Sequence, residues 1–559
     1  MQSTSSSVKM KLEILQQYAV PGNIPWTSRK VRIIAVLCGI LCLRFFLGAL
    51  DVKPIQNRLP NALRQQTYLD QAGFQSIPIT GFVNTGDLSS RTCEDLRHEG
   101  ELRVDKSLYL EDDLEHIARS LAGHPMIDYS QQEKGLTFRQ MVAKTWARLS
   151  GSSVWIEKFK VFLTVTRVIF YDNGLRHKPV ISFLAGQLHD ENWNELKNYT
   201  IQWQSEEIKF PTVFNIPAPF KQGDRYFGPE DPRVILEEGV EDAEPIVTFN
   251  MLYDLKTGDR AMYIFRPFSN DTTVLTITGQ TERAHAEKNW APFFINEHEP
   301  ISPGHYKWPS HYIHFIYDFN PLRVLKCHTL NGWCHFVYEQ KVPDELRGSG
   351  LNANGRMTGG TNMVPLQLET RSNLNAWVGF PRSHINIGCT DDLAMYRPEL
   401  MIMTAHGDHF YLSFMSGPID FGTAAMTPEA ISDPCGEGKV VIANSIAKWD
   451  RRPKHDVLTL TFSVADSTVQ IMQLASLSKF VSQLPHVAHL DGAFLADMSS
   501  RNKTEWDLRY TAVSKDVLDC TMEAASYYSE IIAAPFKGLS KEELSYENGK
   551  WDWKAGAVI

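Results

Sequence analysis

The stretch RVLKCHTLNGWCHFVYE, from Arg323 to Glu339, contains two runs of strand-forming residues on either side of an Asn-Gly pair. Such a pair between two runs of this kind is typical of the tight turn of a β-hairpin. Cys327 and Cys334 flank the segment HTLNGW that forms the turn. We therefore expect the two cysteines to face each other across two strands.

Runs of the same kind recur from about Trp155 onward, separated by Asn-Gly, Gly-Asp and Pro turns. They gather in about five clusters, near residues 161–204, 244–280, 312–340, 375–415 and 440–475. Many short strands with frequent turns indicate a β-sandwich, a barrel or a propeller. The pattern itself leaves these three architectures open.

The segments on either side of this β-rich part have a different character. Residues 51–150 combine Pro and Gln with helical patches such as YLEDDLEHIARSLAG, which predicts a stem followed by a helical segment. After residue 505, DVLDCTMEAASYYSEIIAAPF has helical periodicity and predicts a closing helix. We therefore expect five parts: an N-terminal tail (1–32), a hydrophobic segment (33–50), a stem and helical entry segment (51–150), a β-rich domain (151–480) and a helical closing segment (481–559).

A hydrophobic segment near the N-terminus predicts a membrane anchor. IIAVLCGILCLRFFLGAL, from Ile33 to Leu50, has 18 residues, which is just long enough to span a bilayer. The preceding residues carry five Lys or Arg against a single Glu, so the positive-inside rule places them in the cytosol and the rest of the chain in the lumen. Arg44 interrupts the segment, and a buried core helix is the alternative.

Composition and cysteine content agree with a folded lumenal protein. Of 559 residues, 43% are hydrophobic and 22% are charged, and the net charge is -9, with no basic block of the kind that binds nucleic acid. Six cysteines follow the anchor, and six allow 15 full pairings in an oxidising compartment. N-glycosylation sequons begin at Asn198, Asn270 and Asn502.

The stretch RYFGPEDPRVI, from Arg225 to Ile235, places two carboxylates between two prolines. Pro232 stiffens the backbone directly after Asp231, and a carboxylate held on a stiff turn is well placed for proton transfer. The residues of the stretch are equally compatible with a charged turn held by ion pairs. Further motifs follow in a fixed order: AEKNWAPFF at 286–294, YIHFIYDFNPLRVL at 312–325, GGTNMVPL at 359–366 and AWVGFPRSHI at 376–385.

This ordered set of motifs resembles the fungal β-1,2-mannosyltransferases. It is also similar, more distantly, to the β-mannoside phosphorylases and mannosyltransferase/phosphorylases that share the E-D-P-R core. The resemblance covers residues 150–480 and the anchor layout. It implies an all-β fold, a five-bladed β-propeller with added helical segments and the active site in its central funnel. It also implies a type II membrane protein of the Golgi.

The resemblance implies roles for residues at matching positions. Asp231 matches the catalytic acid/base of the family. The remaining matches are listed by expected role: Lys288, Arg260 and Arg167 as cations that bind the donor phosphates; His384, Asn289 and Tyr317 in a sugar or phosphate subsite; and Glu230 and Arg233 as supports of the turn. Trp290, Trp333, Trp377, Tyr226 and Tyr317 are candidates for stacking on sugar rings, although most large aromatics in a β fold belong to the core.

These roles imply an inverting transfer of mannose from GDP-mannose to a mannose-containing acceptor. A leaving diphosphate needs fixed positive charge, and the sequence has no D-x-D triplet for a metal, no C-x-x-C pair and no H-x-x-x-H spacing. We therefore expect neither a metal nor another cofactor. The alternatives are a phosphorylase or hydrolase on the same scaffold, and a membrane-anchored lectin without activity.

Overall fold

The structure is a computed structural model, in which the chain forms two compact units, Met1–Leu63 and Arg64–Ile559. The structure describes residues of the second unit only. The described ranges are 74–111, 113–130, 135–172, 178–240, 242–280, 283–295, 308–346, 355–366, 374–386, 394–426, 430–431, 436–452, 455–485, 503–533, 551–552 and 557–558. The expected anchor, Ile33–Leu50, and the sequon at Asn502 lie outside them. Among these residues, no helix has the length and apolar character needed to cross a membrane.

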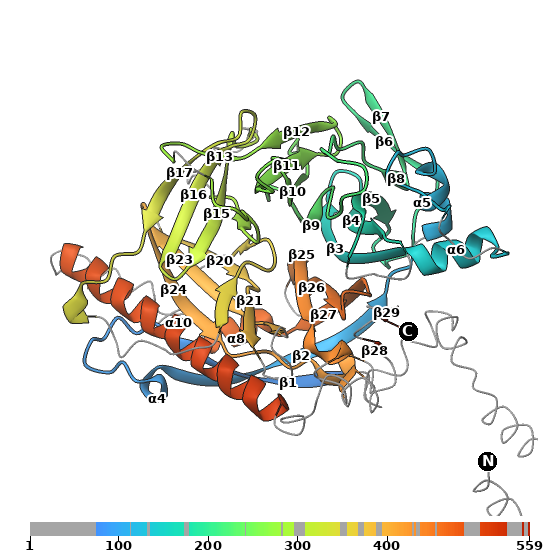
Figure 1. Ribbon diagram of the computed structural model, residues 1–559. Coiled ribbons are helices and arrows are strands. Elements are labelled where there is room, and N and C mark those ends of the chain that lie inside the picture. Colours follow the sequence, from blue (N-terminus) through green and yellow to red (C-terminus); the bar gives the residue numbers. More distant parts are fainter. Residues whose placement is uncertain are drawn as a thin grey trace, which may run out of the picture. The chain divides into compact units, whose positions relative to one another are not determined.

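Four large sheets follow one another around a common centre in propeller-like order (Figure 1). The first contains β3 (Trp146–Ile156), β4 (Val161–Phe170), β5 (Ile181–His189) and β8 (Thr212–Val213). The second contains β9 (Glu230–Ile235), β10 (Ile246–Leu252), β11 (Arg260–Arg266) and β12 (Asp271–Val274). The third contains β13 (Thr276–Ile277), β14 (Ala291–Phe293), β15 (Tyr312–Phe319), β16 (Leu322–His328) and β17 (Trp333–Glu339).

The fourth sheet has nine strands, and smaller elements complete the fold. In spatial order it contains β19 (Val364–Pro365), β20 (Leu374–Gly379), β23 (Met401–His406), β24 (His409–Ser416), β1 (Gln75–Val83), β2 (Arg97–Tyr109), β27 (Gln470–Ala475), β26 (His455–Val464) and β25 (Val441–Arg452). The smaller sheets are β18 (Gly355–Thr358), β21 (Arg382–Asn386) and β22 (Ala394–Pro398); β6 (Tyr199–Trp203) and β7 (Glu206–Phe210); and β28 (Trp551–Asp552) and β29 (Ala557–Val558). The α-helices in the described ranges are α4 (Cys93–Leu96), α5 (Leu114–Ser120), α6 (Phe138–Thr145), α8 (Leu477–Gln483) and α10 (Lys503–Ala533).

The hairpin predicted from the sequence is confirmed. Strands β16 and β17 pair antiparallel with Cys327 opposite Cys334, and a disulfide joins the two buried residues. Gly332 in the turn has a φ of 73°, and a Cβ there would collide with the carbonyl oxygen of Val274. Glycine is therefore required at this position both by the backbone conformation and by the close approach of the neighbouring sheet.

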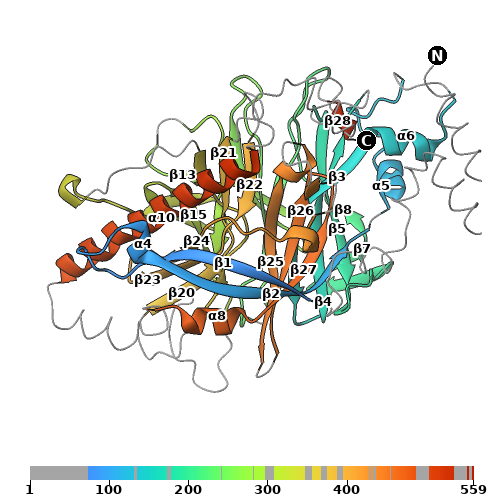
Figure 2. The same ribbon diagram turned by 90° about the horizontal axis from the view of Figure 1, so that it is seen from below.

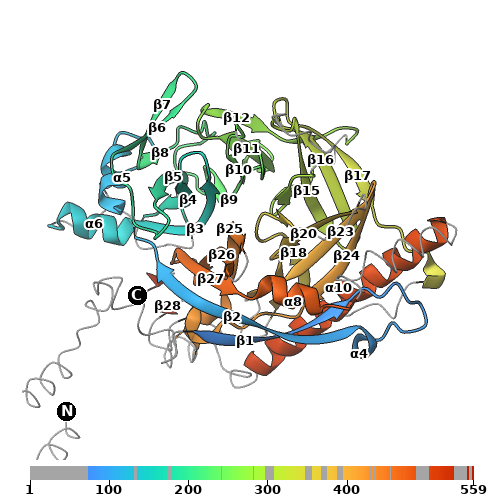
Figure 3. The same ribbon diagram turned by 180° about the vertical axis from the view of Figure 1, so that it is seen from behind.

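The N-terminal hairpin of β1 and β2 joins two halves of the nine-stranded sheet. β1 pairs with β24 and β2 pairs with β27, both antiparallel, so the first two strands described lie beside strands from the C-terminal part of the unit (Figures 2 and 3). Here the structure differs from the stem expected over residues 51–150. The alternation of buried and exposed residues along β1, with Ile77 and Ile79 in the core, is the period of a half-buried strand.

The closing helix is confirmed as α10, which packs on β24. Val513, Val517 and Leu518 of the helix are buried in one apolar cluster with β24 residues, and the Ser514 hydroxyl accepts a hydrogen bond of 2.9 Å from the Leu412 amide. Because β24 also pairs with β1, the helix covers the sheet where its two halves meet.

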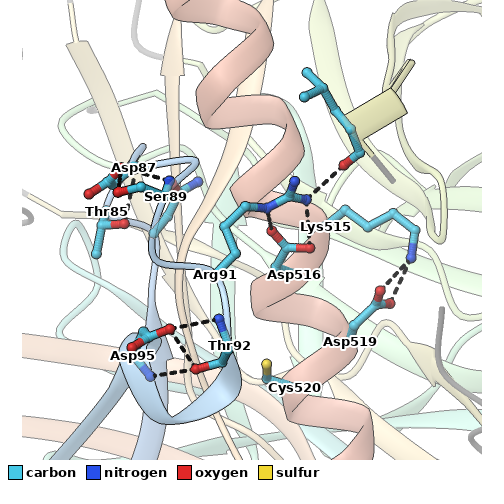
Figure 4. A network of polar contacts seen from close by, with 12 residues as sticks. Thr85, Asp87, Ser89, Arg91, Thr92, Asp95, Lys515, Asp516, Asp519 and Cys520 are labelled. Atoms are coloured by element: carbon cyan, nitrogen blue, oxygen red, sulfur yellow. Dashed lines mark hydrogen bonds and ion pairs between the residues drawn. The ribbon is translucent and has the colours of Figure 1, made fainter. Parts of the chain in front are cut away.

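A polar network and a disulfide tie the loop between β1 and β2 to this helix (Figure 4). The Arg91 guanidinium contacts both carboxylate oxygens of Asp516, at 2.5 and 2.9 Å, and also donates to the Leu346 carbonyl at 2.8 Å. Two residues further on, Cys93 forms a disulfide with Cys520, one turn after Asp516. The connection between the halves of the sheet is thereby fixed at the loop as well as along the strands.

We predict that Arg91→Ala lowers the free energy of unfolding by about 3 kcal/mol, because it leaves the buried Asp516 carboxylate without its cation. Urea unfolding followed by tryptophan fluorescence measures the loss. The control is Arg97→Ala, which breaks only exposed ion pairs with Glu94 and Glu99 and is expected to cost about 1 kcal/mol or less. Equal losses in the two variants would contradict a structural role for the Arg91 contact.

Candidate active site

Asp231, the second residue of strand β9, has a strained backbone conformation. Asp231 has a φ of 52° although it is not glycine and precedes Pro232, and residues before proline favour extended conformations. Gly228, three residues earlier, has a φ of 80°, and a Cβ there would collide with the Ser182 carbonyl of β5. The turn is therefore packed closely against the first sheet. Strain of this kind costs about 1–3 kcal/mol and concentrates at functional sites.

Glu230 and Asp231 are adjacent in sequence and both contact Arg167, but only Glu230 is closely paired. Glu230 Oε1 lies 3.0 Å from Arg167 Nη2, and its Oε2 lies 2.9 Å from Arg260 Nη2, so both carboxylate oxygens are paired. Asp231 Oδ1 has only two distant contacts at 3.5 Å, to Arg167 Nη1 and to the Ser150 hydroxyl. The Asp231 side chain is 30% exposed and that of Glu230 is 18% exposed. Asp231 thus keeps hydrogen-bonding capacity for a ligand.

The charges around Asp231 keep it ionised. Burial by itself would raise the pKa of the Asp231 carboxyl. The positive charges of Arg167, Arg382, Arg233 and Lys288 together outweigh burial, and the pKa is lowered from its usual value. The carboxylate is consequently deprotonated and able to accept a proton at neutral pH.

Hydrogen bonds bring three of the sequence motifs together beside this turn. Arg382 Nη2 donates to Asn289 Oδ1 at 2.8 Å, and the Gly359 amide donates to the Asn289 carbonyl at 3.1 Å. Asn289 also has a positive φ, of 62°. The buried Arg233 guanidinium donates to the carbonyls of Pro232 and Gly360. The E-D-P-R turn, the E-K-N-W segment, the G-G-T turn and the strand of Arg382 therefore form one cluster.

His384 lies in a strongly positive environment on β21. Arg356 of β18 is its register partner on one side and Tyr396 of β22 on the other, where the two rings lie 4.8 Å apart. Burial, followed by the charges of Arg356, Arg382 and Lys288, lowers the pKa of His384. The imidazole is therefore neutral near pH 7 and offers both a donor and an acceptor.

The other predicted site residues are placed as follows. Arg167 and Arg260 reach the site, but each is paired with Glu230. Tyr317 lies on β15, where its hydroxyl donates to Glu287 at 3.3 Å and its ring packs against Trp290. Asn198 and Asn270 are exposed, as acceptors of N-linked glycan must be.

The aromatic candidates fall into two groups. Trp290 and Trp377 are buried in the core and present no face to a sugar. Trp333 is 65% exposed on β17, and Tyr226 is exposed directly before the E-D-P-R turn, with its carbonyl accepting from Arg260 Nη1 at 3.3 Å. Tyr226 is thus the candidate whose backbone contacts the site.

Three residues at the site carried no individual role in the sequence interpretation. Arg382 and Arg356 contribute positive charge, and Ser150 of β3 approaches Asp231 from the first sheet. Arg382 lies in a motif that the sequence does single out, whereas Ser150 has no sequence signal beyond a small polar residue in a strand. Its φ of 53° is visible only in the structure. Among the described residues, no group of three or more His, Cys, Asp or Glu side chains is arranged to hold a metal ion.

The sequence profile that describes the beta-mannosyltransferases matches residues 92–262 and 267–528 of this chain. The matched ranges include every residue of the cluster around Asp231. The chain belongs to the β-mannosyltransferase family.

Members of this family from yeasts illustrate the degree of similarity. Beta-mannosyltransferase 1 of Komagataella phaffii is 34% identical over 439 residues, which are 74% of this chain and 64% of that protein. Beta-mannosyltransferase 3 of Candida albicans is 29% identical over 503 residues, which are 84% of this chain and 83% of that protein. The chain thus spans somewhat under two thirds of the length of the Komagataella protein.

Solved structures overlap with the chain at low scores. A GDP-Man-dependent mannosyltransferase from Leishmania mexicana is 11% identical, covers 59% of this chain and 85% of its own, and has a TM-score of 0.33. A score of this size is too low to carry an argument about function.

We predict that Arg356→Ala raises the pKa of His384 toward its ordinary value of 6.5, because one of the positive charges that oppose protonation is removed. NMR titration of the imidazole measures this change, with Arg103→Ala on β2 as the control. The wild-type protein takes up this proton at lower pH than the unfolded chain does. The contribution of His384 to stability is therefore lost as the pH falls below about 6.5. An unchanged pKa in Arg356→Ala would contradict the assigned cause.

Glu399 fixes the backbone between Arg382 and His384, and this role gives a second prediction. Its fully buried Oε2 accepts from the Ser383 amide at 2.7 Å, and its own amide donates to the Pro381 carbonyl at 3.0 Å. Glu399→Ala leaves the Ser383 amide without an acceptor and should cost about 1–3 kcal/mol, measured by urea unfolding. Glu399→Gln keeps an acceptor and should cost less, since burial already raises the pKa of this carboxyl. Equal costs would exclude the hydrogen bond as the cause.

Proposed function

We propose that this protein is an inverting β-1,2-mannosyltransferase that moves mannose from GDP-mannose to a mannose residue of a mannan, N-glycan or glycolipid. The observation that carries the proposal is the ionised Asp231 carboxylate. Its backbone is strained, cations surround it, and its own contacts are long enough to leave the carboxylate able to bind a ligand. Membership of the β-mannosyltransferase family supports the reaction class. The donor and the stereochemistry are inferred from the chemistry below.

Asp231 acts as the general base in this proposal. The acceptor hydroxyl gives its proton to the carboxylate, directly or through a sugar hydroxyl, while its oxygen forms the new bond to C1 of mannose. The bond between C1 and the phosphate oxygen breaks, and GDP leaves with the electron pair. Attack from the face opposite an α-linked leaving group gives a β-linkage, so a single displacement needs no second catalytic carboxylate.

The positive charge beside Asp231 suits a diphosphate leaving group. Lys288, Arg382 and Arg356 lie close enough to His384 for their positive charges to lower its pKa. Arg167 and Arg260 are compensated by Glu230, which leaves the first group as the better anion site. A bound diphosphate would neutralise the charges that lower the pKa of Asp231 and so make this carboxylate a stronger base when the donor is present.

We further propose the topology of a type II Golgi enzyme with the anchor at Ile33–Leu50 and glycans at Asn198, Asn270 and Asn502. The expected five blades are supported by the order of the strands. The nine-stranded sheet divides at the β1–β2 hairpin into one half with β19, β20, β23 and β24 and another with β25, β26 and β27. Counting these halves separately gives five blades in chain order.

We predict that Asp231→Asn lowers the rate of mannose transfer by at least about two orders of magnitude, because an amide cannot accept the proton. The assay uses the lumenal part with GDP-mannose and mannobiose. A matched control is Asp105→Asn on β2, since that side chain is 31% exposed and is likewise paired with an arginine, Arg103, at 2.5 Å. We expect the control to keep its activity.

The other outcomes of this assay separate the alternatives. Full activity in Asp231→Asn would refute the assigned base. Release of mannose 1-phosphate from a β-mannoside and free phosphate would identify a phosphorylase, and absence of any turnover would favour a lectin. Inhibition by EDTA that Mn²⁺ restores would contradict the expectation of a reaction without metal.

A further inference from the structure

A second cavity lies at the opposite end of the strands that carry the reaction site. Its volume is about 590 Å³, within the range of small-ligand sites. It is lined by the end of β3 at Ile156 and by residues 236–240, which follow β9. The Val234 amide donates to the Ser152 hydroxyl, so β3 and β9 run side by side from the Asp231 end. At about 3.3 Å per residue, the six steps along β3 from Ser150 to Ile156 span roughly 20 Å.

Three tryptophans line this cavity: Trp155 is half-buried, whereas Trp203 and Trp449 are buried. The Lys448 ammonium lies 4.0 Å from the ring centre of Trp155, and the Lys158 ammonium lies 5.1 Å from that of Trp203. The third ring is Trp449, whose indole N–H donates to Asp456 at 2.9 Å, while that of Trp155 donates to Glu157 at 2.5 Å. The cations and the hydrogen bonds hold the rings in fixed orientations, so the lining is preformed.

The polar groups of the cavity include both donors and acceptors of hydrogen bonds. Lys158 and Lys448 can donate, and Glu157, Glu237 and Glu238 can accept. Four of the five also have partners within the protein: Lys158 pairs with Asp242, Glu157 with Lys160 and Glu238 with Arg451, and Glu237 accepts from the Ser310 amide. The charges of these five side chains nearly cancel, in contrast to the surplus of cations beside Asp231. A lining of this kind does not favour a diphosphate. It fits a neutral ligand with apolar ring faces and many hydroxyl groups, which is the chemistry of an oligosaccharide.

We propose that this cavity, lined by Trp155, Lys448 and Glu238, is a second carbohydrate site that holds a mannose-containing chain away from the reaction centre. The identity of the sugar rests on the proposed function. A polymeric acceptor bound here would stay attached between transfers, which raises the effective concentration of its chain ends at Asp231. A short acceptor cannot reach both sites and would gain nothing.

Affinity electrophoresis in gels that contain soluble mannan tests the proposal without catalysis. All variants carry Asp231→Asn, so that binding is measured apart from transfer. We expect mannan to retard the protein, and Trp155→Ala to weaken the apparent affinity at least about fivefold. Lys448→Gln and Glu238→Gln, which remove single polar groups from partly exposed positions, should each weaken it about threefold. The matched control is Tyr527→Ala, which removes an exposed aromatic side chain of α10.

A kinetic measurement in the active enzyme complements the binding test. Lys448→Gln is expected to raise KM for mannan about threefold while kcat for mannan and KM for mannobiose stay unchanged. If mannan does not retard the protein, or if Trp155→Ala and Glu238→Gln do not reduce the retardation, the second site is refuted. This holds even if the enzyme transfers mannose. Retardation that depends on Trp155 but not on Tyr527 supports the site even if transfer from GDP-mannose is never observed.

Discussion

The pairing of β1 with β24 and of β2 with β27 is the constraint on which the arrangement of the sheets depends. Without this hairpin the nine-stranded sheet would present two open edges, and exposed edges are prone to wrong pairing. The same closure holds β25 against β3, where the Ser445 hydroxyl accepts from the Ser153 amide at 2.7 Å. Since the Ser150 hydroxyl of β3 lies 3.5 Å from Asp231, the geometry of the candidate active site is connected to strands that begin at residue 75.

Electrostatics give the two neighbouring carboxylates of the E-D-P-R turn different roles. Glu230 saturates its oxygens with Arg167 and Arg260 and so anchors the turn. Asp231 is left with long contacts and a field of positive charge that outweighs burial. Both carboxylates contact the Arg167 guanidinium, but only Glu230 has a second, close ion pair, so Asp231 is the one that keeps free hydrogen-bonding capacity.

Local signals allowed several features to be predicted from the sequence. The Asn-Gly turn predicted a hairpin with Cys327 facing Cys334, helical periodicity predicted α10, and the order of the motifs pointed to the residues that the structure brings together. Contacts between distant segments were not predictable, because no local pattern records them. Asn289 and Arg382 are 93 positions apart, and Ser150 and Asp231 are 81 apart. The strands of residues 75–109 were also missed: β1 has the two-residue period of a half-buried strand, but the partners of β1 and β2 outside their hairpin, β24 and β27, follow far later in the chain.

The long separation between β2 and β27 also has a consequence for how the protein is made. β2 ends at Tyr109 and its partner ends at Ala475, so roughly 370 residues must be synthesised before the pair can form. At 5–20 residues per second this takes about 20–70 s. The ring of sheets therefore closes only near the end of translation, and until then the first hairpin to leave the ribosome is a nascent segment without its final partners. Chaperones that shield unpaired strands during this interval would determine the fraction of molecules that reach the closed fold.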